Sequence, residues 1–203
     1  MIQIERFINE LMKSNCYILW DDDSHRCVVI DPASEKSENE IAFIDKRSLI
    51  LDYIFLTHEH TDHNWGVNAI LERFSESKLV CHKICAEALA IESSIYFRLY
   101  YDNPNYTYTI EMVDILLTDN ITRWSWDGKE IVFEYTPGHS MGSVCIVVGN
   151  MIFSGDTIMP YKPYINKRNG SRDCYDKSIT YMNNKYKGKG FIIQPGHGEK
   201  FCF

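Results

Sequence analysis

The chain has 203 residues, of which 45% are hydrophobic and 24% are charged, and its formal net charge at pH 7 is −7. This length can bury a substantial core, so we expect one domain over residues 1–203, of ordinary globular composition. An acidic chain is poorly suited to nucleic acid, whose binding depends on neutralising phosphates, and no apolar run is long enough for a membrane span. We therefore expect neither a nucleic-acid nor a membrane partner.

The seven cysteines are odd in number and include no Cys-x-x-Cys pair, which does not indicate a disulfide framework. The N-terminus has no basic start followed by a long apolar run, so no signal peptide is expected. These features favour reduced cysteines and a cytoplasmic location.

Short strands and two helices are predicted before residue 82. Ser37 and Glu40 have the spacing of a capping box, which predicts a helix that continues through Ile44. A second helix is predicted over residues 66–74. Strands are predicted over residues 2–8, 15–20, 26–30, 53–57 and 78–81. The apolar run at 53–57 is typical of a strand buried on both faces.

The remainder of the chain repeats this pattern of strands and helices. A long helix is predicted over residues 83–101. We interpret the Tyr-rich stretch 96–108 as a wall or lid over the site, or alternatively as aromatic packing beneath a loop. Strands are predicted over 112–117, 121–126, 130–135, 143–148, 151–154 and 191–194, with a helix over 173–186. Two similar halves of this kind predict an α/β (α+β) fold with two packed sheets and helices outside.

Four potential metal ligands directly follow the strand at 53–57, in the segment His58-Glu-His60-Thr-Asp62-His63. Residues two apart in an extended segment point the same way, so His58 and His60 can present their imidazoles to one ion. Asp62 and His63 follow after a turn and suit a second ion nearby.

Three later ligands, His139, Asp156 and His197, each follow a predicted strand in a turn containing glycine. Imidazole and carboxylate favour zinc, iron or manganese, and no thiolate lies in these turns. A carboxylate can bridge two cations, which can share a water and lower its pKa to about 7. The pattern predicts a two-metal site. Lone histidines such as His25 and His82 are interpreted as surface residues.

These motifs resemble those of the metallo-β-lactamase fold superfamily over most of the chain. The segment 56–63 looks like its first metal motif, and the segments 136–144, 153–157 and 195–198 are similar to the second, third and fourth. The most similar branch is that of the glyoxalase II-like hydrolases. The resemblance implies a four-layer αββα sandwich of two mixed β-sheets flanked by helices.

The resemblance also implies a role for each ligand. The first metal would be bound by His58, His60 and His139, the second by Asp62, His63 and His197, and Asp156 would bridge the two. Asp62 would also orient the attacking water, with Asp31 and Thr57 supporting the ligands from behind. The implied cofactors are two divalent ions, with zinc expected and iron or manganese as alternatives.

The expected function is a binuclear metal-dependent hydrolase that uses a metal-bridging hydroxide on an ester, thioester, lactone or phosphodiester of a small molecule. The β-lactamases of this fold generally lack the bridging aspartate, so Asp156 argues against antibiotic hydrolysis. Six residues follow His197, so we expect no helical substrate domain of the glyoxalase II type. The alternatives are a mononuclear iron enzyme of the persulfide dioxygenase type, a nuclease of the same superfamily and a non-catalytic binding module. No feature of the sequence indicates an oligomeric state.

Overall fold

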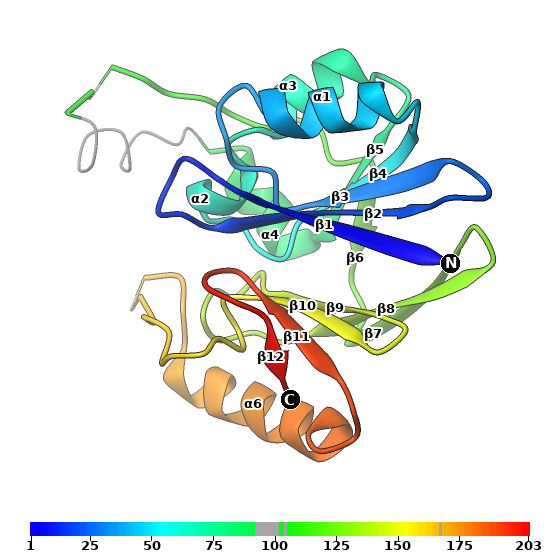
Figure 1. Ribbon diagram of the computed structural model, residues 1–203. Helices are drawn as coiled ribbons and strands as arrows, with labels where there is room; N and C mark the ends of the chain where they lie inside the picture. Colours follow the sequence, from blue (N-terminus) through cyan, green and yellow to red (C-terminus); the bar gives the residue numbers. More distant parts are fainter. Residues whose placement is uncertain (92–101, 104, 167) are drawn as a thin grey trace.

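The computed structural model describes residues 1–91, 102–103, 105–166 and 168–203, and two six-stranded sheets stack face to face in it (Figure 1). The first sheet contains β1 (Ile2–Ile8), β2 (Asn15–Asp21), β3 (Arg26–Ile30), β4 (Ile50–Phe55), β5 (Lys78–His82) and β6 (Ile115–Leu117). The second contains β7 (Ile121–Trp126), β8 (Lys129–Tyr135), β9 (Val144–Val148), β10 (Met151–Gly155), β11 (Ile192–Pro195) and β12 (Phe201–Cys202).

Helices cover the outer face of each sheet. The described helices are α1 (Glu38–Lys46), α2 (Thr61–Asn64), α3 (Val67–Arg73), α4 (Lys83–Leu89) and α6 (Arg172–Tyr186). In Figure 1, α1 and α3 lie above the first sheet and α6 lies below the second. The expected four-layer αββα sandwich is therefore confirmed.

Both sheets are mixed, as expected. In the first sheet, β1, β2 and β3 pair antiparallel, while β3, β4, β5 and β6 pair parallel. In the second sheet only β10 and β11 pair parallel, and the other neighbours are antiparallel. The parallel strands β4, β10 and β11 and the antiparallel strand β8 lead into the metal motifs, so the carboxyl ends of these four strands position the predicted ligands.

Strand β2 shows why the chain forms four layers. All of its residues are buried, and successive side chains point to opposite faces. Cys16 and Ile18 join the core beneath α1, α3 and α4, whereas Tyr17 and Leu19 join the core between the sheets. A third core lies between the second sheet and α6, around Met182 and Ile193.

Two predicted helices differ from the structure. The capping box is wrong: helix α1 begins at Glu38 as expected, but Ser37 is left-handed (φ 44°) and makes no side-chain cap. Its hydroxyl instead donates to the carbonyl of Ser34 at 3.2 Å. The long helix over 83–101 is also wrong in its described part, because α4 ends at Leu89; residues 92–101 lie outside the described residues.

Two strands and one short helix also depart from the prediction. The strand expected at 112–117 begins only at Ile115, because the Asp114 carboxylate accepts the Leu79 amide at 2.8 Å. Strand β12 and the four-residue helix α2, which carries Asp62 and His63, were not predicted.

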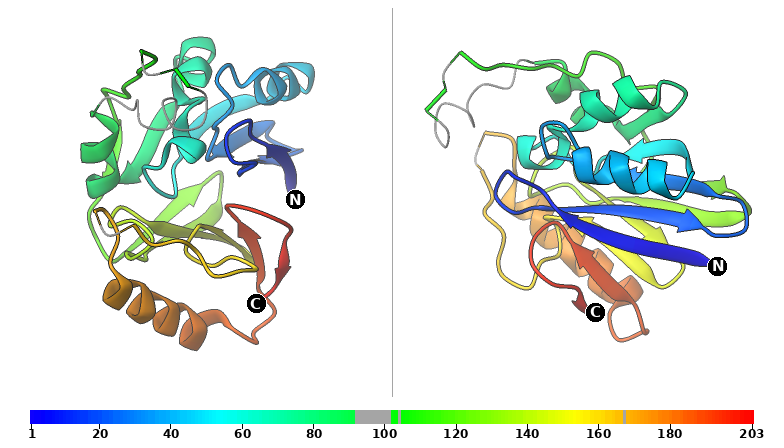
Figure 2. Two further views of the ribbon diagram at one scale, coloured as in Figure 1. Left: turned by 90° about the vertical axis from the view of Figure 1, so that its left-hand side faces the viewer. Right: turned by 45° about the horizontal axis from the view of Figure 1, so that its top comes forward.

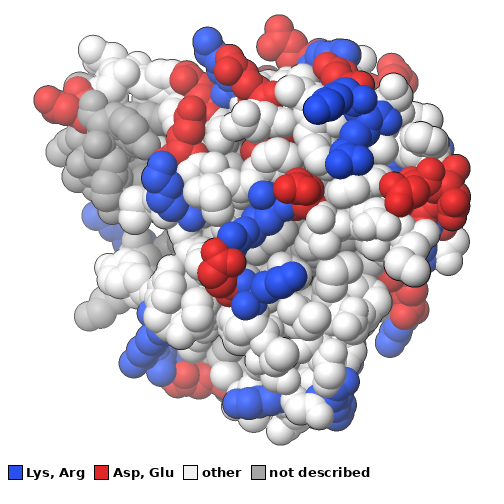
Figure 3. All heavy atoms as spheres, in the orientation of Figure 1, with Lys and Arg blue, Asp and Glu red and all other residues white. Residues whose placement is uncertain are grey.

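The surface charges and the state of the cysteines can be compared with what the composition predicts. All seven cysteines are free. Positive and negative side chains are interspersed on the face seen in Figure 3. Among the described residues, no helix has both the length and the apolar character to span a bilayer. His25 is exposed as predicted, but His82 is buried: it stacks on Tyr135 at 4.1 Å and accepts the Ile84 amide at the start of α4.

Candidate metal centre

All seven predicted ligands lie at one end of the two sheets, which faces the viewer in Figure 2, left. The first sheet supplies the segment after β4, which runs through His58 and His60 into α2. The second sheet supplies His139 after β8, Asp156 after β10 and His197 after β11. The two sheets are joined here by a backbone bridge between Ser14 and His197.

The first group consists of His58, His60 and His139, which each offer a ligand atom within 4.8 Å of the others. His60 Nδ1 lies 3.1 Å from His58 Nε2 and 2.9 Å from His139 Nε2. His58 and His60 face the same point, as the sequence predicts, although the chain bends at Glu59 between them and is not an extended strand. His139 joins them from the second sheet.

The second group consists of Asp62, His63 and His197, whose ligand atoms also lie within 4.8 Å of one another. Asp62 Oδ2 is 3.3 Å from His197 Nε2 and 3.8 Å from His63 Nε2. Asp62 and His63 occupy the single turn of α2, so adjacent residues can reach the same point. The Ser14 hydroxyl donates to the Asp62 carbonyl and ties this turn to the β1–β2 loop.

Asp156 lies between the two groups. Its Oδ1 is 3.5 Å from His63 Nε2, and its Oδ2 is 3.5 Å from His139 Nε2 and 3.6 Å from His197 Nε2. Among the described residues, His63 Nε2 and Asp156 Oδ1 are buried without a hydrogen-bond partner. Buried polar atoms of this kind require an explanation, and facing a bound cation is one that fits their chemistry.

Burial and charge set different protonation states in the two groups. Burial lowers the pKa of His58 and His139 and lowers that of His60 to about 4, so these imidazoles are neutral, the form that binds metal. Burial alone would also lower the pKa of His63, but Asp156 and other carboxylates outweigh it and raise that pKa. Burial opposes ionisation of Asp156, yet the surrounding histidines hold its pKa low.

Asp31 supports the ligands from behind, as the resemblance implies. Its carboxylate accepts from the Thr57 amide (2.8 Å) and hydroxyl (2.6 Å) and lies 3.0 Å from His63 Nδ1. Thr57 Oγ1 is in turn 3.0 Å from His58 Nδ1. Asp31, His58 and His63 are also close enough to form a third ligand group. We interpret their proximity as hydrogen bonding, because the Asp31 carboxylate is already occupied by Thr57 and His63.

A loop after β10 contributes contacts that the sequence analysis missed. The Tyr164 carbonyl lies 2.8 Å from His139 Nδ1, and the Asn169 side chain lies 3.1 Å from His60 Nε2. Glu59, between the first two histidines, accepts from the Ser140 hydroxyl at 2.8 Å and so joins the first motif to the second. No motif in the sequence marks these partners, because they meet only in the folded chain.

The described part of the Tyr-rich stretch packs against α2 and the residue that follows it. Tyr108 donates to the side chain of Asn64, and the Trp65 ring donates to the Tyr106 hydroxyl at 3.1 Å. Residues 96–101 and 104 lie outside the described residues. These contacts agree with the alternative of aromatic packing, and the lid remains a prediction.

Gly196 allows the fourth motif to approach the centre closely. A Cβ at this position would lie 2.2 Å from Asp156 Oδ1 and 2.8 Å from His63 Cε1. The Gly196 amide donates to the carbonyl of Gly155 at 2.7 Å, so β11 and β10 are held together beside the ligands. Glycine is therefore required here for close approach of the chain to the ligands.

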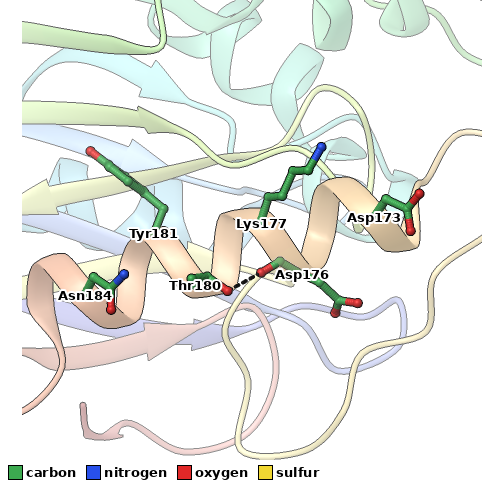
Figure 4. A pocket seen from close by; sticks show the side chains of 6 residues that line it. All are labelled: Asp173, Asp176, Lys177, Thr180, Tyr181 and Asn184. Carbon is green, nitrogen blue, oxygen red and sulfur yellow. Dashed lines mark hydrogen bonds between the residues drawn. The ribbon is translucent and has the colours of Figure 1, made fainter.

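Away from the predicted ligands, a hollow of about 580 Å³ lies along α6 (Figure 4). It is lined by Asp173, Asp176, Lys177, Thr180, Tyr181 and Asn184. None of the seven predicted ligands lines this hollow. We therefore do not identify it with the candidate metal site.

Fold and site together define an αββα protein with histidine and aspartate groups suited to divalent metals. The chain belongs to the metallo-beta-lactamase superfamily, whose family model matches residues 10–191. It is similar to a hydroxyacylglutathione hydrolase of Buchnera aphidicola, with 28% identity over 74% of this chain and 50% of the relative. The glyoxalase II-like resemblance is thereby supported.

Solved structures of other proteins share this fold. The B3 metallo-beta-lactamase BLEG-1 has 25% sequence identity and a TM-score of 0.86, covering 98% of this chain and 93% of that one. TTHA1623, in a di-iron-bound form, has 20% identity and a TM-score of 0.77, covering 98% and 94%. The chain spans between 26% and 50% of the length of the hydroxyacylglutathione hydrolases it matches.

Proposed function

We propose that this protein is a binuclear metal-dependent hydrolase that cleaves a thioester or ester bond in a small molecule. Lactones and phosphodiesters are the other bonds open to the same chemistry. The proposal is carried by Asp156, whose Oδ1 approaches His63 and whose Oδ2 approaches His139, each at 3.5 Å. One carboxylate that faces two ligand groups suits a bridge between two cations.

The seven side chains would hold the two cations as the resemblance implies. His58, His60 and His139 would bind the first, Asp62, His63 and His197 the second, and Asp156 both. When bound, divalent cations supply Lewis acidity and lower the pKa of water to about 7. We propose zinc as the metal; iron suits the same ligands, and TTHA1623 is a fold relative that binds it.

The chain's own residues provide orientation and charge. Asp62 Oδ2, 3.3 Å from His197 Nε2, would accept a hydrogen bond from the attacking water and orient it. Asp31 holds His63 in a fixed orientation through its 3.0 Å contact with Nδ1. Fixed groups of this kind stabilise developing charge without reorganising during the reaction.

Thioesters are favoured within this class because several of the curated relatives are hydroxyacylglutathione hydrolases. A mononuclear iron enzyme would leave the group of Asp62, His63 and His197 without a role, although its ligand atoms lie within 4.8 Å of one another. The formal net charge of −7 does not favour a nuclease, because binding to nucleic acid depends on neutralising phosphates.

The test combines metal content with turnover. Purified protein should contain about two metal equivalents per chain by elemental analysis. Asp156→Ala should lose at least one equivalent and reduce hydrolysis of a hydroxyacylglutathione thioester by about 100-fold or more. The matched control is Asp173→Ala, which removes a carboxylate from the exposed side of α6 and should change neither quantity.

The substrate panel should also include an aryl ester, an aryl phosphodiester and a β-lactam. Full activity of Asp156→Ala would end the bridging proposal. Oxygen consumption by iron-loaded protein with a persulfide, without hydrolysis on the panel, would favour the mononuclear alternative. Turnover of the β-lactam alone would overturn the inference from Asp156 against antibiotic hydrolysis.

A further inference from the structure

We propose that Asn169 is a positioning residue for the first metal group. Its side-chain carbonyl accepts the Nε2 proton of His60 and so fixes the ring tautomer that leaves Nδ1 free to bind metal. The inference rests on the proposed function only in taking His60 as a ligand.

The geometry of His60 determines which ring nitrogen faces the metal group. Its Nδ1 lies 3.1 Å from His58 Nε2 and 2.9 Å from His139 Nε2, whereas its Nε2 lies 3.1 Å from the Asn169 side chain. A neutral imidazole carries one proton, so a ring that binds metal through Nδ1 must carry that proton on Nε2. Its neighbour must then be a hydrogen-bond acceptor.

The Asn169 amide has an acceptor, but it points elsewhere. The atom beside His60 Nε2 is Asn169 Nδ2, itself a donor, while Asn169 Oδ1 is buried without a hydrogen-bond partner in the part of the chain described. A half-turn of the terminal torsion exchanges the two ends of an asparagine amide. That single rotation gives the Nε2 proton an acceptor and the orphaned oxygen a donor.

The backbone holds Asn169 at this place. Its carbonyl accepts the Met141 amide at 2.8 Å, and the next two residues are tied down as well. The Gly170 amide donates to the Asn166 carbonyl, and the Ser171 amide donates to the Gly138 carbonyl, each at 2.8 Å. Asn169 is thus anchored to the turn that carries His139 and reaches across to a histidine of the first motif.

Rotation of the Asn169 amide removes its hydrogen bond to Glu59. Burial raises the pKa of Glu59, and hydrogen bonds from Ser140 and Asn169 partly oppose that rise. Glu59 keeps the Ser140 hydroxyl at 2.8 Å after the rotation, so its carboxyl retains a donor. The competing role for Asn169 is therefore donation to Glu59, and it requires the opposite tautomer of His60.

The decisive experiment reads the tautomer directly. Long-range ¹H–¹⁵N spectra of zinc-loaded wild-type protein should show the His60 proton on Nε2 and in slow exchange with water, as a hydrogen bond to Asn169 Oδ1 requires. A proton on Nδ1, or an Nε2 proton in fast exchange with water, would overturn the proposal. This measurement needs no variant, so a substitution that fails to fold cannot leave the question open.

Metal affinity provides the second reading. Asn169→Leu keeps the side-chain size but removes the acceptor, and it should weaken zinc binding by about 10- to 100-fold in competition with a chelator. The control is Asn166→Ala in the same loop, whose side chain accepts only from the Arg168 amide among the described contacts. Equal zinc affinities for the two variants would overturn the proposal. Absence of hydrolysis would count against the proposed function and leave both readings intact.

Discussion

Glu40 offers a test of the fold that is independent of the metals. It lies in the first turn of α1, the residue is 1% exposed, and its Oε2 has no hydrogen-bond partner among the described residues. Burial raises its pKa, partly opposed by its own backbone amide. The perturbation is Glu40→Gln, which keeps the size and removes the charge.

The expected change in the free energy of unfolding follows from two opposing contributions. Burying an ionised carboxylate whose Oε2 has no partner costs about 1–3 kcal/mol or more, a cost of charge that the neutral glutamine avoids, and the helix N-terminus returns about 0.3–1 kcal/mol to that charge. We expect Glu40→Gln to raise the free energy of unfolding by about 1–2 kcal/mol at pH 8. For a chain of this size that is about 2–8 °C in melting temperature.

The sign of the pH dependence follows from the raised pKa. Below the ordinary carboxyl pKa of about 4.3, Glu40 is protonated in both states and carries no charge penalty. As the pH rises towards and through the raised folded-state pKa, the unfolded chain loses its proton first, so the wild type loses stability. The stability difference between Glu40→Gln and wild type should therefore grow from pH 4 to pH 8.

The assay is urea denaturation of metal-free protein at several pH values, with Glu38→Gln as the control. Glu38 occupies the same helical turn but is exposed, so its substitution should change stability by less than about 0.5 kcal/mol. A stability difference that does not grow with pH, or an equal effect of the control, would refute the reasoning.

Three further predictions concern other parts of the molecule. Glu134→Ala should lower the free energy of unfolding, measured by urea denaturation, by about 2–3 kcal/mol. This is less than the full cost of breaking a buried ion pair, because the side chain of its partner Lys185 is 31% exposed. A loss under about 1 kcal/mol would contradict it. Gly196→Ala should reduce the metal content below two equivalents because its Cβ would collide with Asp156, whereas Gly128→Ala, with open space around it, should retain both. Zinc at 100 times its dissociation constant should stabilise the wild type by about 2.7 kcal/mol per site in thermal unfolding; no shift would exclude binding to the folded state.

The sequence was sufficient to predict the layers of the fold, because the strands carry their own signal. In β2 the side chains that alternate between two cores are already apolar on both faces, and turn residues mark its ends. The meeting of the seven predicted ligands at one place could be predicted for the same reason, since each follows a strand end or lies in one contiguous segment.

The contacts that the loop after β10 makes with the histidines could not be predicted. Asn169 meets His60 across 109 residues, in a loop without periodicity, so only the folded backbone brings them together. Local patterns also misled where tertiary contacts prevailed. Ser37 has the spacing of a helix cap, but its hydroxyl bonds to Ser34 instead. The strand β6 begins only after Asp114, because the side chain of Asp114 takes the place of a backbone acceptor for the Leu79 amide.

The distribution of ligands over both sheets has a consequence for biosynthesis. Residues of the first group are all present once His139 has been translated, whereas the second group needs His197, 58 residues later (197 − 139). If the protein holds two ions as proposed, a ribosome-bound nascent chain cannot assemble the complete centre before β11 has been made. Loading of the second ion would then be confined to the last stage of synthesis or to the period after release.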